Sequence, residues 1–292
     1  MSNHPVYAST AGVADHFSSL PKLLAGLTTA GLSHIELGWS PPLDGLALPN
    51  GLNEFPASWL VHNYFPAPTR PFVLNLASQH PVTLQRSREF CLEAIRFSAV
   101  LGAPFYSVHC GFLAEFDSES LGRRLDYTEI CSYERGYTTF LASLHLLVPA
   151  AQAAGIRLLI EPNVVSSFNL VDGRNLLLML AEPHEFTRLL AELPDPHLGI
   201  LLDLGHLNVT AATLGFSTAD FIEAVAPAIG AFHIHDNNGI ADQHLPVTPD
   251  SWTLDVIRES RFDGLPVINE AKFNKPALMV EHCIWLKKYL SR

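Results

Sequence analysis

The stretch Gly199–His206, which reads GILLDLGH, indicates how this chain folds. An apolar run of strand length ends in the carboxylate of Asp203, and a glycine and a histidine follow it. Near-continuous apolar runs are typical of parallel strands that are buried on both faces. The stretch therefore predicts a buried parallel strand that delivers a polar side chain at its carboxyl end.

Short segments of this kind alternate along the chain with longer segments of helical spacing. The predicted strands are Pro5–Ser9, His34–Leu37, Phe72–Leu76, Phe105–His109, Arg157–Glu161, Gly199–Asp203, Ala231–His235 and Leu265–Glu270. The predicted helices are His16–Ala30, Thr83–Leu101, Tyr133–Ala154, Pro183–Leu193, Thr218–Ile229, Asp250–Glu259 and Lys275–Tyr289. Repeated alternation without a linker favours a (β/α)8 TIM barrel over an open doubly wound sheet, with 1–292 as a single domain.

Glycines support these boundaries. Gly31, Gly102, Gly155 and Gly230 each stand where a predicted helix ends and the next strand follows. The glycines form neither GxGxxG nor GxxxxGK[ST], so a nucleotide-binding sheet has little support.

Composition excludes several classes of protein. Of 292 residues, 48% are hydrophobic and only 16% are charged, which favours a large core over disorder. No apolar run has the ~18–20 residues that a membrane-spanning helix needs. Met1–Ser9 has no signal-peptide pattern, and the four cysteines form no CxxC pair, so we expect reduced thiols and a cytoplasmic protein. The net charge of −11 disfavours nucleic acid as a partner without excluding it, because bound metal ions would offset the charge.

Metal-competent residues stand at the ends of the predicted strands. His109, Glu161, Asp203 and Glu270 each end one strand, and His233 lies near the end of another. Because the carboxyl ends of barrel strands meet on one face, these side chains are expected to crowd together. Divalent cations would relieve the repulsion among the carboxylates, and mixed imidazole and carboxylate ligands suit Zn, Mn or Fe(II).

Two spacings strengthen the prediction of a metal site. Asp203 and His206 are three residues apart, with His206 expected in the loop after the strand. Asp242 and His244 are separated by one residue, so their side chains share a face of an extended loop.

Several segments resemble the xylose isomerase-like barrels, which include sugar phosphate isomerases/epimerases and apurinic endonuclease IV. The resemblance covers nearly the whole chain. It is carried by SHIELG (33–38), HNYFP (62–66), FVLNLAS (72–78), SVHCG (107–111), LLIEPN (158–163), LLDLGH (201–206), FHIHDNNG (232–239), DQHLP (242–246) and INE (268–270).

The resemblance implies the ligand set. In the sugar isomerases and epimerases one divalent ion would be held by Glu161, Asp203, His233 and Glu270. In endonuclease IV the site holds three ions through nine ligands. Carried over, His62, His109 and Glu161 would hold the first ion. Glu161 would bridge to the second, which Asp203, His233 and Glu270 would also hold. The third would be held by His206, Asp242 and His244.

Two departures from endonuclease IV favour the sugar branch. The loop Gly38–Gly45 is acidic and contains prolines where the repair enzyme carries basic and aromatic side chains. Asn63–Pro71 separates His62 from the predicted third strand. Against the sugar branch, no arginine follows His233 closely, where some sugar epimerases hold substrate hydroxyls.

The leading hypothesis is therefore a metal-dependent isomerase or epimerase of a sugar or sugar phosphate. Glu161 and Glu270 would be its catalytic carboxylates, acting in proton transfer next to a carbonyl. Three alternatives stay open: a trinuclear phosphoesterase, a multinuclear non-haem iron oxidase and a barrel that only binds a metabolite. One to three divalent ions are expected.

Other residues are candidates for contact with substrate. His235 lies two residues after His233, Trp39 lies on an expected mouth loop, and Arg70 is a candidate phosphate clamp. Glu36 would touch substrate or form a hydrogen bond inside the barrel. Homo-oligomerisation is expected only by analogy with such barrels.

Overall fold

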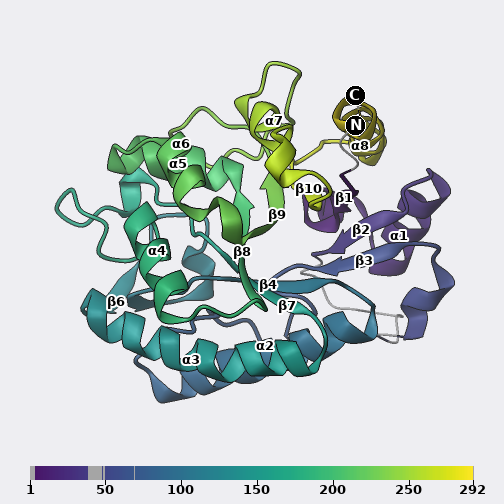
Figure 1. Ribbon diagram of the computed structural model, residues 1–292. Coiled ribbons are helices and arrows are strands. Elements are labelled where there is room, and N and C mark those ends of the chain that lie inside the picture. The colour runs from purple at the N-terminus through teal and green to yellow at the C-terminus, as the bar shows by residue number, and fades with distance from the viewer. Residues whose placement is uncertain (1–3, 39–47, 49, 69, 292) are drawn as a thin grey trace.

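A parallel β-sheet curls into a nearly closed barrel at the centre of the structure, and helices surround it (Figure 1). The computed structural model describes residues 4–38, 48, 50–68 and 70–291. Its eight-stranded sheet has the order β3-β2-β1-β10-β9-β8-β7-β4, and the unpaired edges β3 and β4 lie next to each other. The predicted (β/α)8 barrel is confirmed.

The strands of the barrel are short. They are β1 (Val6–Ser9), β2 (His34–Leu37), β3 (Ser58–Val61), β4 (Phe105–His109), β7 (Arg157–Glu161), β8 (Leu198–Asp203), β9 (Ile229–Ile234) and β10 (Val267–Asn269). A separate antiparallel hairpin consists of β5 (Ala114–Phe116) and β6 (Tyr127–Ile130). The helices are α1 (Leu20–Thr29), α2 (Pro81–Val100), α3 (Tyr133–Ala153), α4 (Pro183–Glu192), α5 (Leu204–Leu214), α6 (Thr218–Val225), α7 (Trp252–Ile257) and α8 (Pro276–Leu290).

The predicted third strand is wrong. Phe72–Leu76 forms no strand, and β3 instead pairs in parallel with β2, with His34 opposite Ser58 and Leu37 opposite Val61. Hydrogen bonds hold Asn75 outside the sheet. Its backbone N–H donates to the hydroxyl of Ser87, and its side-chain amide donates to the carbonyl of Phe112 and accepts from the N–H of Phe112. His62 consequently follows the third strand directly, and Asn63–Pro71 is not an insertion between the histidine and its strand.

Two smaller predictions also need correction, and one hairpin was missed. His206 lies in the first turn of α5, an unpredicted helix, rather than in a loop. The hairpin of β5 and β6 was not predicted either. Gly31, Gly102 and Gly155 have the positive φ of helix ends, but Gly230 lies inside β9.

Apolar side chains fill the barrel below its carboxyl face. Tyr7, Phe105, Leu159, Leu201 and Ile268 belong to one buried cluster inside the barrel, and a larger core fills the space between strands and helices. In the described part of the chain, no helix combines the length and apolarity needed to cross a membrane. Polar groups are therefore concentrated at the carboxyl ends of the strands, where the candidate site lies.

Candidate metal centre

Four strand-end residues form a buried group that we call the acidic cluster: Glu161, Asp203, His233 and Glu270. Glu161 and Asp203 end β7 and β8, His233 lies in β9, and Glu270 follows β10. Each is at most 7% exposed, and one ligand atom from each lies within 4.8 Å of the others. The structure therefore brings together the four residues that the resemblance assigned to one ion.

His233 is aimed at this cluster by Glu36. The Nε2 atom of His233 lies 3.0 Å from Glu36 Oε1, whereas Nδ1 lies 3.1 Å from Glu161 Oε1 and 3.3 Å from Glu270 Oε2. A ligating histidine commonly donates its second N–H to a carboxylate, which fixes the ring and raises its basicity. Glu36 is fully buried, and its carboxylate accepts a hydrogen bond from His233. This contact fits a role in positioning His233 as a metal ligand.

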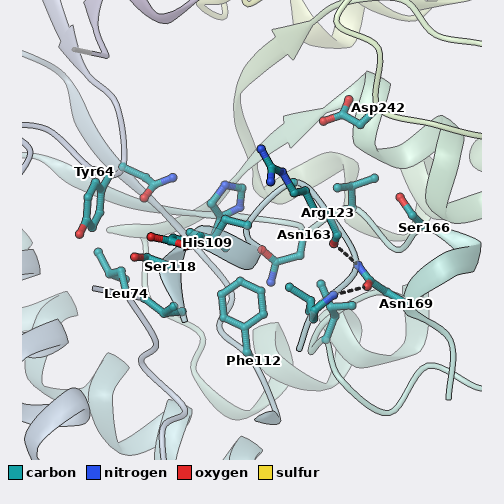
Figure 2. A pocket seen from close by; sticks show the side chains of 18 of the residues that line it. Tyr64, Leu74, His109, Phe112, Ser118, Arg123, Asn163, Ser166, Asn169 and Asp242 are labelled. Atoms are coloured by element: carbon teal, nitrogen blue, oxygen red, sulfur yellow. Dashed lines mark hydrogen bonds between the residues drawn. The ribbon is translucent and has the colours of Figure 1, made fainter. Parts of the chain in front are cut away.

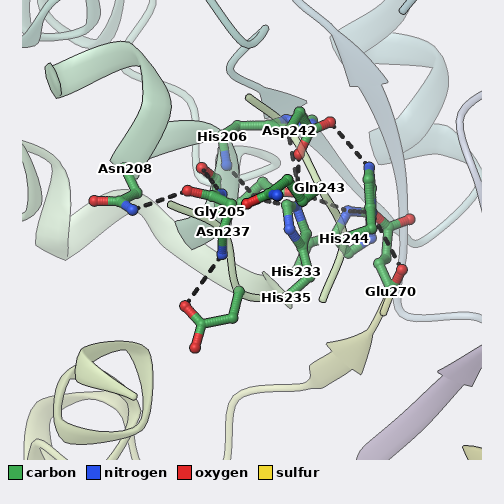
Figure 3. A network of polar contacts seen from close by, with 12 residues as sticks. Gly205, His206, Asn208, His233, His235, Asn237, Asp242, Gln243, His244 and Glu270 are labelled. Carbon is green, nitrogen blue, oxygen red and sulfur yellow. Dashed lines mark hydrogen bonds and ion pairs between the residues drawn. The ribbon is translucent and has the colours of Figure 1, made fainter. Parts of the chain in front are cut away.

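A second group, the histidine cluster, consists of His206, His235, Asp242 and His244 (Figure 3). Asp242 Oδ2 lies 2.9 Å from His244 Nε2 and 3.4 Å from His206 Nε2, and its Oδ1 lies 3.5 Å from His235 Nε2. Three of the four were expected to bind one ion. His235, a candidate for contact with substrate, lies in the same group.

Backbone carbonyls orient two of these imidazoles. His206 Nδ1 lies 3.2 Å from the carbonyl of Pro162, and His244 Nδ1 lies 3.2 Å from the carbonyl of Glu270. A carbonyl only accepts, so Nδ1–H donates in both residues. Each Nε2 therefore faces Asp242, where it donates a proton in the metal-free protein and would offer its lone pair to an ion that replaced that proton.

The loop that carries Asp242 and His244 is held by a short antiparallel bridge. Asp236 and Leu245 exchange backbone hydrogen bonds of 2.7 and 2.8 Å. His244 has a φ of 50°, a left-handed conformation that non-glycine residues seldom adopt. The bridge thus keeps a strained backbone in the position that points His244 inward.

His62 and His109 lie at the edge of the acidic cluster. His62 Nε2 lies 3.2 Å from Glu270 Oε1, and His62, Glu36 and Glu270 form a third group of donors within 4.8 Å. His109 Nε2 lies 3.9 Å from Glu161 Oε2. The resemblance placed His62 on one ion together with His109 and Glu161. In the structure its close neighbour is Glu270.

Charges of opposite sign dominate the centre. Burial opposes ionisation of Glu270, yet His233 and His62 hold its pKa well below the usual range. Burial alone would lower the pKa of His62, but Glu270, Glu36 and Glu161 raise it to about 9. Although burial works against it, His206 and His235 hold the pKa of Asp203 at about 2. In the metal-free protein, protons on imidazoles compensate the carboxylates as bound cations would.

Several buried atoms of the centre have no hydrogen-bond partner in the described part of the chain. They are Oε2 of Glu36 and of Glu161, Oδ2 of Asp203, Oδ1 of Asp242, Nδ1 of His109 and both ring nitrogens of His235. A buried polar group without a partner costs about 1–3 kcal/mol. Carboxylate oxygens and imidazole nitrogens that converge in this way are the donors that Zn, Mn or Fe(II) prefer. The residues therefore fit divalent metal.

A cavity of about 700 Å³ opens beside the histidine cluster (Figure 2). His109, His206, Asp242 and His244 line it, together with residues that the sequence did not single out: Asn63, Asn163, Arg123 and Lys272. Asn163 lies within the quoted LLIEPN segment, two residues after Glu161, which could have identified it. Arg123 belongs to the loop before β6 and has no such signal.

One expected substrate contact, Arg70, lies away from this cavity. The side chain of Arg70 is exposed and does not line this cavity, and its backbone carbonyl accepts a hydrogen bond from Arg86. Trp39 lies outside the described residues.

Comparison with known proteins gives a family and a distant relative. The model of the family described as "Xylose isomerase-like TIM barrel" matches residues 43–289. The uncharacterized protein MJ1311 of Methanocaldococcus jannaschii is 25% identical over 199 residues, which cover 66% of this chain and 59% of that protein. The match thus spans less than two thirds of the length of this relative.

Solved structures resemble the chain over nearly its full length. A D-tagatose 3-epimerase-like protein gives a TM-score of 0.71 at 21% identity, covering 100% of this chain and 97% of that one. The TTHB071 protein of Thermus thermophilus, soaked with ZnCl2, gives 0.61 at 20%, covering 100% and 98%. D-psicose 3-epimerase of Clostridium cellulolyticum, solved with D-tagatose, gives 0.68 at 12%, covering 99% of each chain. At these identities the likeness shows a shared fold.

Proposed function

This chain belongs to the xylose isomerase-like TIM barrel family, and from that premise we propose that it is a divalent-metal-dependent isomerase or epimerase of a sugar or sugar phosphate. Structural neighbours include sugar epimerases, which supports this class of reaction. The observation that carries the proposal is the buried meeting of Glu161, Asp203, His233 and Glu270. This cluster contacts the histidine cluster, which lines a cavity large enough for a small ligand.

The acidic cluster would hold one divalent ion, and the histidine cluster would hold a second. Zn, Mn and Fe(II) all suit these mixed ligands, and the zinc-soaked neighbour supports zinc among them. A bound ion supplies Lewis acidity that polarises the carbonyl and hydroxyl oxygens of a sugar.

Glu161 and Glu270 would move the protons. Both carboxylates lie beside the same nitrogen of His233, at the ends of β7 and β10. One carboxylate removes the proton from the carbon next to the carbonyl, and the electron pair moves onto the carbonyl oxygen. The other, in its protonated form, returns a proton either to the opposite face of the same carbon or to the former carbonyl carbon. In the second case the hydroxyl proton on the first carbon passes to the former carbonyl oxygen. The first outcome is epimerisation and the second is isomerisation.

Asn63 and Asn163 line the cavity and would orient the sugar hydroxyls. The side-chain amide of Asn163 donates to the carbonyl of Gly111 at 3.0 Å, so its position is fixed before substrate binds. A preorganised donor or acceptor of this kind costs little when substrate binds.

Exchange of substrate hydrogen with solvent tests the proposal without knowledge of the stereocentre. The metal-loaded protein is incubated in D2O with a panel of ketoses, aldoses and their phosphates, and deuterium next to the carbonyl is followed by NMR. Exchange is expected with at least one sugar, and Glu161→Gln or Glu270→Gln should abolish it. The exposed Glu93→Gln is the matched control. Exchange that survives in both cluster variants would contradict the roles of these carboxylates.

The histidine cluster favours a second candidate function. Two neighbouring four-residue groups suit more than one ion, and a metal-held hydroxide cleaves phosphate esters. Hydrolysis of phosphate esters or of abasic duplex DNA, with loss on His206→Ala and no deuterium exchange in any sugar, would favour this reaction over proton transfer.

A further inference from the structure

The cavity beside the metal centre has two walls of different character. One wall carries His109, His206, Asp242 and His244. The other carries apolar side chains, among them Leu74, Phe112, Leu121, Leu125, Phe168 and Leu178. Figure 2 shows Leu74 and Phe112 on the side of the cavity away from Asp242.

The apolar wall is built separately from the barrel core. Phe112, Leu125 and Leu178 belong to a buried apolar cluster of their own, which lies outside the main core. Phe112 and Leu178 form an antiparallel bridge, and Asn75 holds the backbone of Phe112 through bonds of 2.9 and 3.0 Å. The wall is therefore fixed in place before any ligand arrives.

Two further side chains of this wall have little protein around them. Leu121 is 47% exposed and Phe168 is 44% exposed, although both line the cavity. Exposed apolar surface that is contiguous with a ligand cavity marks a place where apolar ligand atoms gain free energy by leaving water.

The volume of the cavity exceeds the needs of a single sugar. At about 700 Å³ it lies within the range of about 300–1,000 Å³ that holds drug-sized ligands. A monosaccharide presents hydroxyls on nearly every carbon, so it suits the polar wall and would leave the apolar wall in contact with water.

We infer that the substrate is a glycoside whose sugar ring carries a ketone, because the proposed proton transfer needs a carbonyl that glycosylation does not remove. Its sugar would lie at the metal-lined wall and its apolar aglycone against Leu121, Phe168 and the cluster behind them. The inference rests on the proposed function for the identity of the sugar part. The apolar wall itself predicts only that an apolar group increases affinity. A phosphate ester is the rival ligand, because Arg123 and Lys272 also line the cavity.

Matched pairs of glycosides test this inference. Methyl and phenyl β-glycosides of glucose, galactose, mannose and xylose are titrated calorimetrically into the metal-loaded protein, with the corresponding sugar phosphates in parallel. For at least one sugar, the phenyl glycoside should bind about tenfold or more tightly than the methyl glycoside, since small apolar groups in apolar pockets are worth roughly 10–200-fold. The same phenyl glycoside should also bind more tightly than the phosphate.

The preference should depend on the wall. Leu121→Ala and Phe168→Ala should each reduce the phenyl-to-methyl ratio severalfold. Leu146→Ala should leave it unchanged, because Leu146 is 44% exposed on α3 and does not line the cavity. These exposed side chains contribute little to folding, so the variants should remain folded.

Three results would overturn the inference: equal affinity within every pair, tighter binding of the phosphates, or no binding of any glycoside at millimolar concentration. The proposed function is judged separately by deuterium exchange. A preference for the phenyl glycoside without deuterium exchange would reject the proposed reaction and keep the apolar subsite. Exchange without this preference would keep the reaction and reject the apolar subsite.

Discussion

At the scale of single residues, Glu36 shows how a buried carboxylate can act through a histidine. Its only described contact of hydrogen-bond length is with Nε2 of His233, which leaves Nδ1 directed at the acidic cluster. The sequence suggested either substrate contact or a hydrogen bond inside the barrel, and the geometry favours the second.

Glu36→Gln should weaken metal binding while preserving the fold. Loss of an outer carboxylate that supports a ligating histidine typically costs about 10–100-fold in metal affinity. Competition with a chromophoric chelator measures the affinity, and Glu93→Gln on the exposed face of α2 is the control. An unchanged affinity would mean that Glu36 does not support His233 as a ligand.

The titration of His62 and Asp203 predicts how pH changes the stability of the metal-free protein. Burial lowers the pKa of His62, but Glu270 and its neighbours raise it overall from 6.5 to about 9, so its contribution is full below about pH 6.5 and is lost as pH rises through about 9. The pKa of Asp203 falls from 3.8 to about 2 despite burial, so its contribution is full above about pH 4 and is lost as pH falls through about 2.

The metal-free protein should therefore be most stable between about pH 4 and pH 6.5. Urea unfolding at a series of pH values measures this, with the metal-loaded protein as the comparison. Bound metal should remove the alkaline loss, since the ligating imidazoles then carry no proton at the metal-binding nitrogen. A metal-free protein whose stability stays constant as pH rises through about 9 would count against the ion pairs of His62.

At the scale of elements, the first turn of α5 connects the two clusters of the candidate site. Asp203 caps the helix through a 2.7 Å bond from the N–H of His206, so one short segment supplies a residue to each cluster. Gly205, between them, must be glycine, because a Cβ at this position would lie 2.1 Å from Cε1 of His235.

Gly205→Ala should consequently damage the histidine cluster and spare the helix. Alanine is the better helix former by about 1 kcal/mol, but here its methyl group would displace the ring of His235. We expect the variant to lose one equivalent of metal per chain while its circular dichroism stays unchanged. Gly26→Ala in α1 is the matched control, since its Cβ would meet only the ring of Phe17 at 3.4 Å. Full metal content in Gly205→Ala would show that His235 contributes no ligand.

The sequence predicted most elements because apolar strand runs and helix-ending glycines are local signals. The sequence did not predict β3, because a strand of only four residues carries little periodicity. It predicted Phe72–Leu76 in its place, because apolar composition does not show which groups the backbone forms hydrogen bonds with. The candidate ligands of the acidic cluster were recognisable because they stand at or near strand ends. Arg123 and the apolar wall were not, because loops bring them to the cavity from segments far apart in sequence.

At the scale of the whole molecule, the barrel gathers buried acidic residues that are stable together only with compensating positive charge. Removing metal should lower the melting temperature, because an ion that binds only the folded state stabilises it by mass action, about 2.7 kcal/mol at one hundred times its Kd. Calorimetry before and after chelation measures this. An unchanged melting temperature after complete chelation would show that metal does not stabilise the fold.

The most direct measurement of the central claim is the metal content per chain, by elemental analysis of protein purified without chelator or affinity tag. The proposed centre predicts at least two equivalents of Zn, Mn or Fe, one from each cluster. Glu270→Gln should reduce occupancy of the acidic cluster, and His206→Ala should reduce that of the histidine cluster. Protein that binds none of these metals, even after each is added back, would contradict a metal centre at the mouth of this barrel.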